Sequence, residues 1–184
     1  MIRAFFAIDL PSTIKQQIDD FVSDLQQRVK RHAIHWVKQQ HLHITLQFLE
    51  AIEAKDMPEV IAAVHTEIKT ISAFNLHLGP MELFPTPYRP KIISLVAKPN
   101  ESLAQLSAAI GRGMTATGYA IETRPFRGHL TLGRINVSHT PFVLPEIALP
   151  AMEDITVRDI VLFRSEPRTD GSRYTLMEHF TLKD

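Results

Sequence analysis

Two short segments of the sequence carry the same pattern of histidine and threonine. The first is His43-Ile44-Thr45-Leu46, and the second is His129-Leu130-Thr131-Leu132. Side chains alternate between the two faces of a β-strand, so each histidine shares a face with the threonine two residues later. The pattern therefore predicts two strands that are each anchored by an apolar face and present an imidazole and a hydroxyl on the other.

Two such pairs could catalyse an in-line displacement at phosphorus. Imidazole titrates near neutral pH, so one histidine can accept a proton from the attacking oxygen while the other donates a proton to the departing oxygen. We expect His43 and His129 to be this pair if the two strands face each other across a cleft. The hydroxyls of Thr45 and Thr131 could then donate hydrogen bonds to the non-bridging oxygens, whose charge grows in the transition state. This chemistry requires no metal ion and no covalent intermediate.

Composition sets the surroundings of these strands. The chain has 184 residues, 45% hydrophobic and 22% charged, which suits one domain with a sizeable core. Lys+Arg and Asp+Glu both number 20, so an anionic ligand would need a local basic cluster. The absence of cysteine excludes disulfides, thiolate catalysis and cysteine-ligated zinc. Neither a signal peptide nor an apolar run of membrane-spanning length is present, so we expect a soluble, cytoplasmic monomer that does not contact a membrane.

The order of predicted elements repeats along the chain. An apolar strand at residues 2–8 precedes a helical stripe that ends near Arg31, and His43 follows. A strand at residues 92–97 precedes a second helical stripe, which Asn100 should cap and which closes near Gly118, and His129 follows. The distance from Ile8 to His43 is 35 positions, and that from Val96 to His129 is 33. This order predicts a diverged internal duplication.

The remaining elements favour an α+β fold. Between these two helices another should begin after Asp56, with Asp56 and Glu59 as a capping box. Alternating apolar residues predict a strand at 74–78. Strands at 155–163 and 174–180, joined by a turn that contains Asp170, should form a hairpin. Because strands outnumber helices and several are joined as hairpins, we expect largely antiparallel sheets.

Longer segments around the two motifs resemble a known family. The segments are Arg3 to Pro11, Pro125 to Arg134 and Ser165 to Tyr174, together with the two motifs themselves. They resemble the RNA 2′,3′-cyclic phosphodiesterases, also called 2′-5′ RNA ligases, of the two-histidine phosphoesterase superfamily. The resemblance covers nearly the whole chain. It implies that residues 1–184 form a single bilobal α+β domain, in which two antiparallel sheets related by pseudo-two-fold duplication carry helices on the outside and the motifs line a central cleft.

The resemblance also implies an activity and roles for individual residues. The activity is hydrolysis of RNA 2′,3′-cyclic phosphate ends to 2′-phosphate, without a metal or other cofactor. His43 and His129 match the catalytic positions, with His43 as general acid and His129 as general base, and Arg134 matches a phosphate-contacting arginine. The chain departs from the family pattern at Gly128, where a proline often precedes the second histidine, and at Glu50-Ala51, where a glycine often follows Leu49.

Arginines gather near the second motif. Arg124, Arg127 and Arg134 lie within eleven residues and could bind a phosphate or an RNA backbone, so Arg127 is a candidate substrate-binding residue. The alternative for Arg124 and Arg127 is that they are solvated loop charges. Arg134 has the strand parity of Leu132, so it reaches the site only if the strand twists or ends there.

Aromatic residues are a second class of candidate ligands. Phe48 is a candidate substrate-binding residue because its ring, like those of Trp36 and Tyr174, could stack on a base. The alternative is that these rings pack in the core. Strand alternation favours that alternative for Phe48, because it puts Phe48 on the apolar face together with Leu46.

His41 and His43 raise the question of a metal site. They stand two apart on one face, a spacing that can bind a metal. No carboxylate follows closely to complete a familiar metallohydrolase set, so we do not expect a metal there.

Three functions remain open at this stage. The first is metal-independent hydrolysis of the cyclic phosphate. The second is reversible 2′-5′ RNA ligation, in which a 5′-hydroxyl replaces water at the same site. The third is an RNA-binding module without catalysis, against which the two intact histidines argue. In each case the expected partner is an RNA or oligonucleotide with a 2′,3′-cyclic phosphate end.

Overall fold

The computed structural model describes residues 1–29, 34–122, 124–136, 143–169 and 171–184. The elements in these residues are, in chain order, β1 (Ile2–Asp9), α1 (Ser12–Arg28), β2 (Ile34–Trp36), the 3-10 helix η1 (Gln39–His41), β3 (His43–Ile52), α2 (Met57–Ile68), β4 (Phe74–Phe84), β5 (Ile92–Lys98), α3 (Asn100–Ala116), β6 (His129–Ile135), β7 (Ile155–Val157), β8 (Asp159–Arg168) and β9 (Gly171–Thr181). The predicted α+β class is confirmed.

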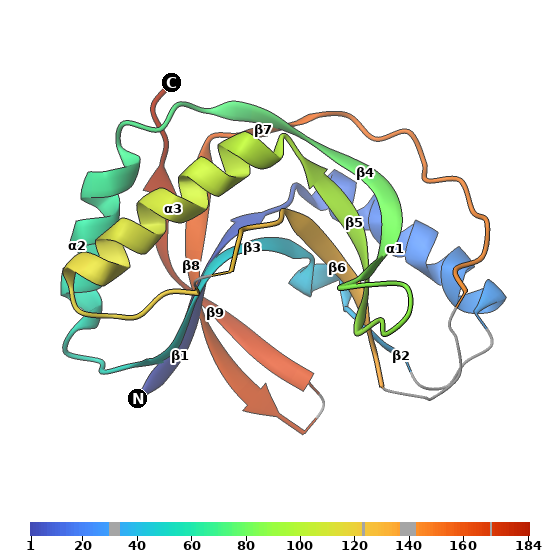
Figure 1. The fold of residues 1–184 in the computed structure, drawn as a ribbon, viewed down its shortest axis with the longest axis horizontal. Helices are drawn as coiled ribbons and strands as arrows, with labels where there is room; N and C mark the ends of the chain where they lie inside the picture. The colour runs from blue at the N-terminus through green and yellow to red at the C-terminus, as the bar shows by residue number, and fades with distance from the viewer. Residues whose placement is uncertain (30–33, 123, 137–142, 170) are drawn as a thin grey trace.

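The strands form two antiparallel sheets. The first has the order β3-β1-β8-β9 and the second the order β2-β6-β5-β4-β7. Each half of the chain therefore supplies a strand to the sheet of the other half: β4 pairs with β5, and β8 returns to pair with β1. Figure 1 shows the two sheets side by side, with the β8–β9 hairpin projecting from the first. This exchange ties the two motif-bearing sheets into one framework.

The helices cover the outer faces of the sheets. In Figure 1, α2 and α3 lie together beside the first sheet, and α1 lies against the second. The apolar stripe of α1 is buried as its spacing predicts, with Ile14, Ile18 and Phe21 inside. Helices α2 and α3 pack closely because Gly113 has no side chain: a Cβ there would lie 2.8 Å from Cα of Val64. None of the described helices is long and apolar enough to cross a membrane.

Both predicted helix caps are wrong in detail. Asp56 precedes α2, but its carboxylate makes no capping bond and instead accepts a hydrogen bond of 2.7 Å from the hydroxyl of Tyr119. Pro99 is the residue that precedes α3, so Asn100 is already helical. The side-chain oxygen of Asn100 accepts a bond of 3.0 Å from the backbone N–H of Gly128. In both cases a partner distant in sequence competes for the local capping group.

Two predicted boundaries also differ from the structure. Helix α1 ends at Arg28, before the expected Arg31, which lies outside the described residues. The strand expected at 155–163 is two strands: β7 pairs with β4 in the second sheet, and β8 pairs with β1 in the first. The chain changes sheets at Arg158, which an apolar run cannot reveal. The β8–β9 hairpin is confirmed, although Asp170 of its turn lies outside the described residues.

Candidate active site

The two motif strands share one backbone irregularity. In the pairing of β3 with β1, Thr45 opposes Ala7 and Gln47 opposes Phe6, so Leu46 is an extra residue. In the pairing of β6 with β5, Leu132 is extra in the same way, between Thr131 and Gly133. A bulge with one extra residue reverses the alternation of side chains beyond it. Both motifs therefore change face directly after the threonine.

This reversal corrects the predicted positions of Phe48 and Arg134. Strand alternation assigned both residues to the apolar face, but Phe48 is 55% exposed and Arg134 is also exposed. After the bulge each shares a face with the histidine and threonine of its own motif. The two residues occupy equivalent places, five positions after the histidine. The first motif thus presents an aromatic ring where the second presents a cation.

Different groups stabilise the two bulges. The carbonyl of Leu46 accepts a hydrogen bond of 2.8 Å from the hydroxyl of Ser107 on α3, and the buried amide of Gln47 donates to the same hydroxyl at 3.0 Å. The carbonyl of Leu132 accepts a bond of 2.9 Å from the backbone N–H of Val37. Each carbonyl displaced by a bulge therefore finds a donor outside its own sheet ladder, which buried backbone groups require.

Both histidines are held in the same tautomer. Nδ1 of His43 lies 2.7 Å from the carbonyl oxygen of His41, and Nδ1 of His129 lies 2.9 Å from that of Arg127. A carbonyl oxygen can only accept, so Nδ1 carries the proton and donates it. In the neutral ring Nε2 is then an acceptor, and in His43 the hydroxyl of Thr45 donates to it at 3.0 Å. Each imidazole is arranged to exchange protons through Nε2.

His43 lies in a setting that disfavours its charged form. Burial of the ring lowers the pKa of His43 from 6.5 to about 4, against the opposing effects of the His41 carbonyl and of Asp9. Asp9 stands directly opposite His43 in the strand pairing but is engaged by Lys15 at 2.6 Å. The free protein therefore carries a neutral His43 at neutral pH.

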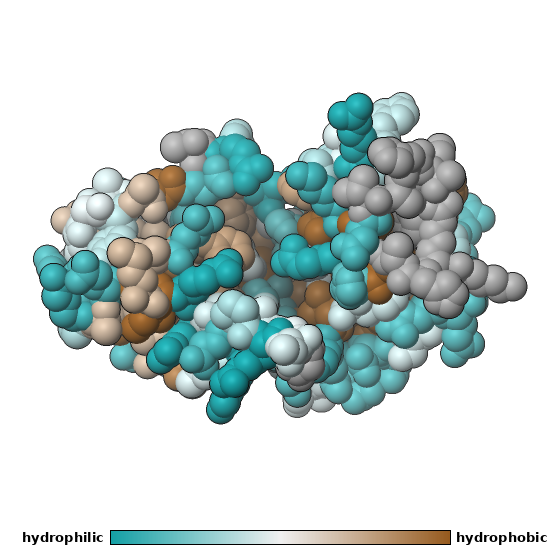
Figure 2. Space-filling model, turned by 90° about the horizontal axis from the view of Figure 1, so that it is seen from below, coloured by the Kyte–Doolittle hydropathy of each residue, from teal (hydrophilic) through white to brown (hydrophobic). Residues whose placement is uncertain are grey.

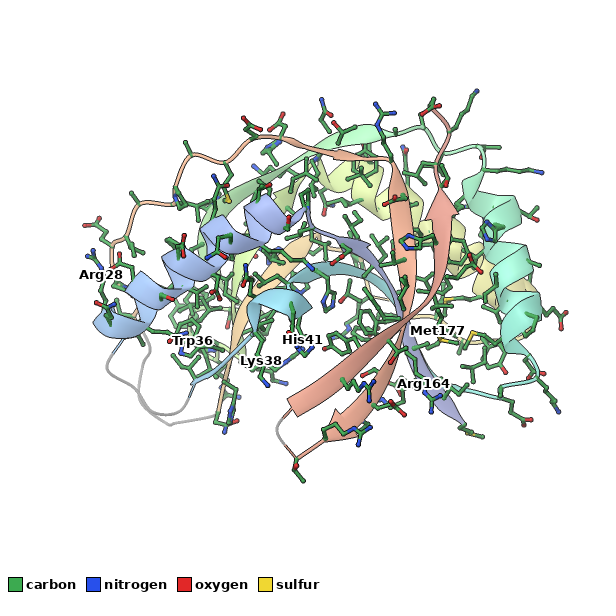
Figure 3. The ribbon with its side chains drawn as sticks, turned by 180° about the vertical axis from the view of Figure 1, so that it is seen from behind. Arg28, Trp36, Lys38, His41, Arg164 and Met177 are labelled. Carbon is green, nitrogen blue, oxygen red and sulfur yellow. The ribbon has the colours of Figure 1, made fainter. Side chains whose placement is uncertain are left out.

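Aromatic rings surround His43. The buried ring of Phe5 lies 4.8 Å from the His43 ring and 5.8 Å from that of Phe48. Tyr174, from the start of β9, lies 5.6 Å from the ring of His43 and 4.6 Å from that of His41. Figure 3 shows His41 at the end of η1, on the side of the β8–β9 hairpin. Phe5 and Tyr174 belong to a small apolar cluster that is separate from the main core.

A pocket of about 160 Å³ opens beside this aromatic group. Its lining residues come from β1, η1, β3, β8 and β9: Asp9, Gln40, His41, His43, Phe163 and Tyr174. Figure 2 shows the corresponding side of the molecule hollowed between its two lobes, with apolar atoms inside the hollow and polar side chains on its rims. The motif strands β3 and β6 lie in contact with each other.

The second motif is surrounded by charged groups and one ring. The ring of Phe84, at the end of β4, stacks on His129 with 5.3 Å between centroids and 12° between planes. The guanidinium of Arg127 lies 5.3 Å from the centre of the same Phe84 ring and pairs with Glu82. Arg134 is exposed, and within the described part of the chain no carboxylate pairs with it. Arg134 is thus available to an anion, whereas the charge of Arg127 is already matched.

The structure explains one departure from the family pattern. The backbone N–H of Gly128 donates to Asn100, a bond that proline could not make. A Cβ at Gly128 would also lie 2.5 Å from Cδ1 of Leu103 and 3.1 Å from the carbonyl oxygen of Ala97, so a side chain there would require Leu103 to move. Gly128 therefore connects the start of β6 to the start of α3.

Trp36 and Arg124 each have a partner within the protein. Trp36 packs over Gly133, where a Cβ would lie 3.0 Å from the indole. Arg124 pairs with Glu122 at 2.6 Å and is fully solvated. Among the residues that the structure describes, no group of three or more potential metal-ligating side chains gathers.

Sequence reasoning missed Phe5, Phe84 and Glu82. Phe5 lies in a continuous apolar run whose two faces cannot be distinguished from periodicity. Phe84 and Glu82 precede a proline-rich loop and were not assigned to a strand, but β4 extends as far as Phe84. A strand expected to run six residues further, to Phe84, would have put both on one face.

Comparisons with known proteins agree with this geometry. A family model described as the 2′-5′ RNA ligase superfamily matches residues 10–169. An RNA 2′,3′-cyclic phosphodiesterase of Geobacillus stearothermophilus is 29% identical over 164 residues, which cover 88% of this chain and 51% of that protein. The chain therefore spans about half the length of this relative. A protein of the same name from Thermotoga maritima is 22% identical over 178 residues, covering 96% of this chain and 93% of that protein.

A solved structure has the same fold. The crystal structure of E. coli LigT complexed with 3′-AMP superimposes with a TM-score of 0.80 at 24% identity, covering 100% of this chain and 99% of that one. The match of the family model extends over both motifs and most of the chain. The chain belongs to the 2′-5′ RNA ligase superfamily.

Proposed function

We propose that this chain hydrolyses RNA 2′,3′-cyclic phosphate ends to 2′-phosphates, using His43 and His129 as a general acid and base and no metal ion. The observation that carries the proposal is the matched tautomer of the two histidines, each of which donates Nδ1–H to a carbonyl and leaves Nε2 for proton exchange. The names of the curated relatives support the substrate, and the 3′-AMP complex of E. coli LigT supports a nucleotide ligand.

The reaction needs one proton accepted and one donated. One histidine accepts a proton from water as the water oxygen attacks phosphorus, and the bond from phosphorus to the 3′-oxygen breaks. The other histidine donates a proton to that 3′-oxygen, so the phosphate remains on the 2′-oxygen. The hydroxyls of Thr45 and Thr131 and the guanidinium of Arg134 stabilise the charge on the non-bridging oxygens.

In the family assignment His43 is the acid, so it must be protonated when substrate is bound. The lowered pKa of His43 makes it neutral in the free protein. An anionic phosphate next to the ring favours the imidazolium and raises the pKa again. Substrate binding would therefore be coupled to uptake of a proton at His43. His129 remains neutral in this scheme and accepts the proton from water.

The superfamily description supports ligation as a second candidate function. A 5′-hydroxyl in place of water would attack the same cyclic phosphate and be deprotonated by the same base. Which reaction occurs then depends on the nucleophile that the cleft binds.

The test is hydrolysis of a short RNA that ends in a 2′,3′-cyclic phosphate, with excess chelator present and with 2′- and 3′-phosphate products resolved. We expect turnover to 2′-phosphate that survives chelation and is lost in His43→Ala and His129→Ala. Adding an RNA with a free 5′-hydroxyl to the same reaction would reveal ligation. Binding without turnover would instead indicate an RNA-binding module, and turnover abolished by the chelator alone would refute the metal-free mechanism.

A further inference from the structure

A buried carboxylate near the second motif has no part in the mechanism above. Glu82 on β4 stands opposite Ser94 on β5, which stands opposite Thr131 on β6, so the three form a row across the second sheet. Within the described residues, the buried side-chain atoms that lack a hydrogen-bond partner are Oε1 of Glu82 and Oγ of Ser94. Burying an unpaired carboxylate oxygen costs free energy, so its presence here calls for an explanation.

The other oxygen of Glu82 has a partner, and this partner links the carboxylate to the second motif. Oε2 of Glu82 accepts a hydrogen bond from the guanidinium of Arg127, and the Glu82 side chain is only 19% exposed. The same guanidinium lies against the ring of Phe84, which stacks on His129. The side chain of Arg127 is thus held by two residues of β4, although Arg127 itself lies in the loop before β6.

The backbone of Arg127 carries this restraint to the catalytic ring. The carbonyl of Arg127 accepts the Nδ1–H of His129, which selects the tautomer that leaves Nε2 for chemistry. The peptide group that contains this carbonyl has a second partner, because its N–H, that of Gly128, donates to the side-chain oxygen of Asn100 at 3.0 Å. Asn100 thus holds this peptide group from the side of Gly128, and the anchored side chain of Arg127 holds the Cα at its other end.

The first motif achieves the same result differently. His41 is the residue equivalent to Arg127, two positions before the histidine, and its carbonyl accepts the Nδ1–H of His43. The ring of His41 packs on Tyr174 at 4.6 Å, and η1 fixes its backbone. In the first motif an aromatic contact and a helical turn therefore hold the residue whose carbonyl binds the histidine. In the second motif a carboxylate has this role.

We propose that Glu82 is a positioning residue for His129: by binding Arg127 it fixes the carbonyl that orients the imidazole. This inference rests on the proposed function for its effect on catalysis, but its structural part does not. Glu82 touches no substrate, and its effect passes through Arg127. The loss of its charge should therefore alter His129 before it alters substrate binding.

The test uses Glu82→Gln, which keeps the size of the side chain and removes its charge. The matched control is Glu67→Gln, because Glu67 pairs with Arg112 at 2.7 Å on the outer surface. Nitrogen-15 spectra of the histidines, recorded where the imidazoles are neutral, report the tautomer of each ring, and His129→Ala assigns the relevant signal. We expect the Nε2–H tautomer of His129 to appear in Glu82→Gln and to be absent in the wild type and in Glu67→Gln.

Kinetics on the cyclic phosphate substrate provide the second readout. Misorientation of a catalytic group should lower kcat about tenfold while KM stays within about twofold. Arg127→Gln should produce the same change of the His129 tautomer. Because the Arg127 side chain is half exposed, this variant tests the proposal if Glu82→Gln does not fold. A wild-type His129 tautomer in both variants would overturn the proposal, as would a rise in KM without a fall in kcat. If the wild type shows no turnover, the proposed function fails and the tautomer measurement still decides this inference.

Discussion

The two motif strands share a backbone plan but differ in chemical surroundings. Both carry a bulge after the threonine, and both hold their histidine through a carbonyl two residues earlier. Around His43 lie the rings of Phe5 and Tyr174, and burial lowers the pKa of the imidazole. Around His129 lie the stacked ring of Phe84 and the ion-paired Arg127, and the exposed Arg134 shares its face of β6. Under the proposed function, the shared part would set the geometry of proton exchange, and the different parts would set which group of the substrate binds on each side.

This difference gives the site a polarity. Apolar rings are suited to a nucleoside, and the exposed guanidinium of Arg134 is suited to the phosphate. The equivalent places of Phe48 and Arg134 make the contrast direct, because the same bulge turns both towards the site. A repeated backbone can therefore bind an asymmetric substrate by varying a few side chains.

The largest effects should come from the histidines, where the two motifs are alike. His43→Ala and His129→Ala should each lower turnover about 10² to 10⁴-fold, because each removes one of the two proton transfers. Thr45→Val and Thr131→Val should lose less, since water can partly replace a hydroxyl. Steady-state kinetics on the cyclic phosphate RNA measures these losses, and circular dichroism checks folding. Full activity in either histidine variant would remove that residue from the mechanism.

The next largest effect should separate the two motifs. Arg134→Gln should weaken binding of inorganic phosphate about 10 to 100-fold, because a charge-assisted hydrogen bond is lost. Phe48→Ala is the matched variant at the equivalent place and should leave inorganic phosphate binding unchanged while weakening binding of a nucleotide. Calorimetric titration with phosphate and with 3′-AMP measures both. Equal effects of the two variants on phosphate would contradict the polarity described above.

A smaller effect should appear in stability at the first bulge. Ser107→Ala leaves the carbonyl of Leu46 without its donor and the amide of Gln47 without one acceptor, which should cost about 1 to 2 kcal/mol. Thr115→Ala on the same helix is the control, because the hydroxyl of Thr115 only supplements a helical carbonyl at 2.8 Å. Urea unfolding measures both. The second bulge has no equivalent variant, since its donor is the backbone of Val37.

Stability should also depend on pH through the buried ring of His43. The pKa of His43 is about 4 in the folded protein and 6.5 unfolded, so the unfolded chain binds more protons between these values. The unfolding free energy of the wild type, relative to His43→Gln, should therefore rise with pH from 4 to 6.5 and stay level above. Denaturation at a series of pH values tests this. A relative stability that falls with pH in that window would show that the pKa is raised, not lowered.

Several features of the chain could be predicted because they depend on short-range pattern. The two strands with His43 and His129, the buried stripe of α1, and the β8–β9 hairpin each follow from periodicity over a few residues. The doubled order of strand, helix and motif indicated two similar halves. These features are set locally, by which side of an element must avoid water.

Other features depended on partners far away in sequence. The caps expected at Asp56 and Asn100 are replaced by bonds to Tyr119 and Gly128, and β7 and β8 separate because the chain changes sheets at Arg158. No local pattern contains those partners.

By itself, the sequence determined the residues that can do chemistry at this site: two histidines, each paired with a threonine on a strand whose other face is buried. Only the tertiary structure decided what stands beside them. A single extra residue at Leu46 and at Leu132 turns Phe48 and Arg134 from the predicted apolar face to the site, and long-range bonds to Ser107 and Val37 hold those bulges. The physical reason is that alternation is a property of one strand, whereas a bulge exists only in the register between two.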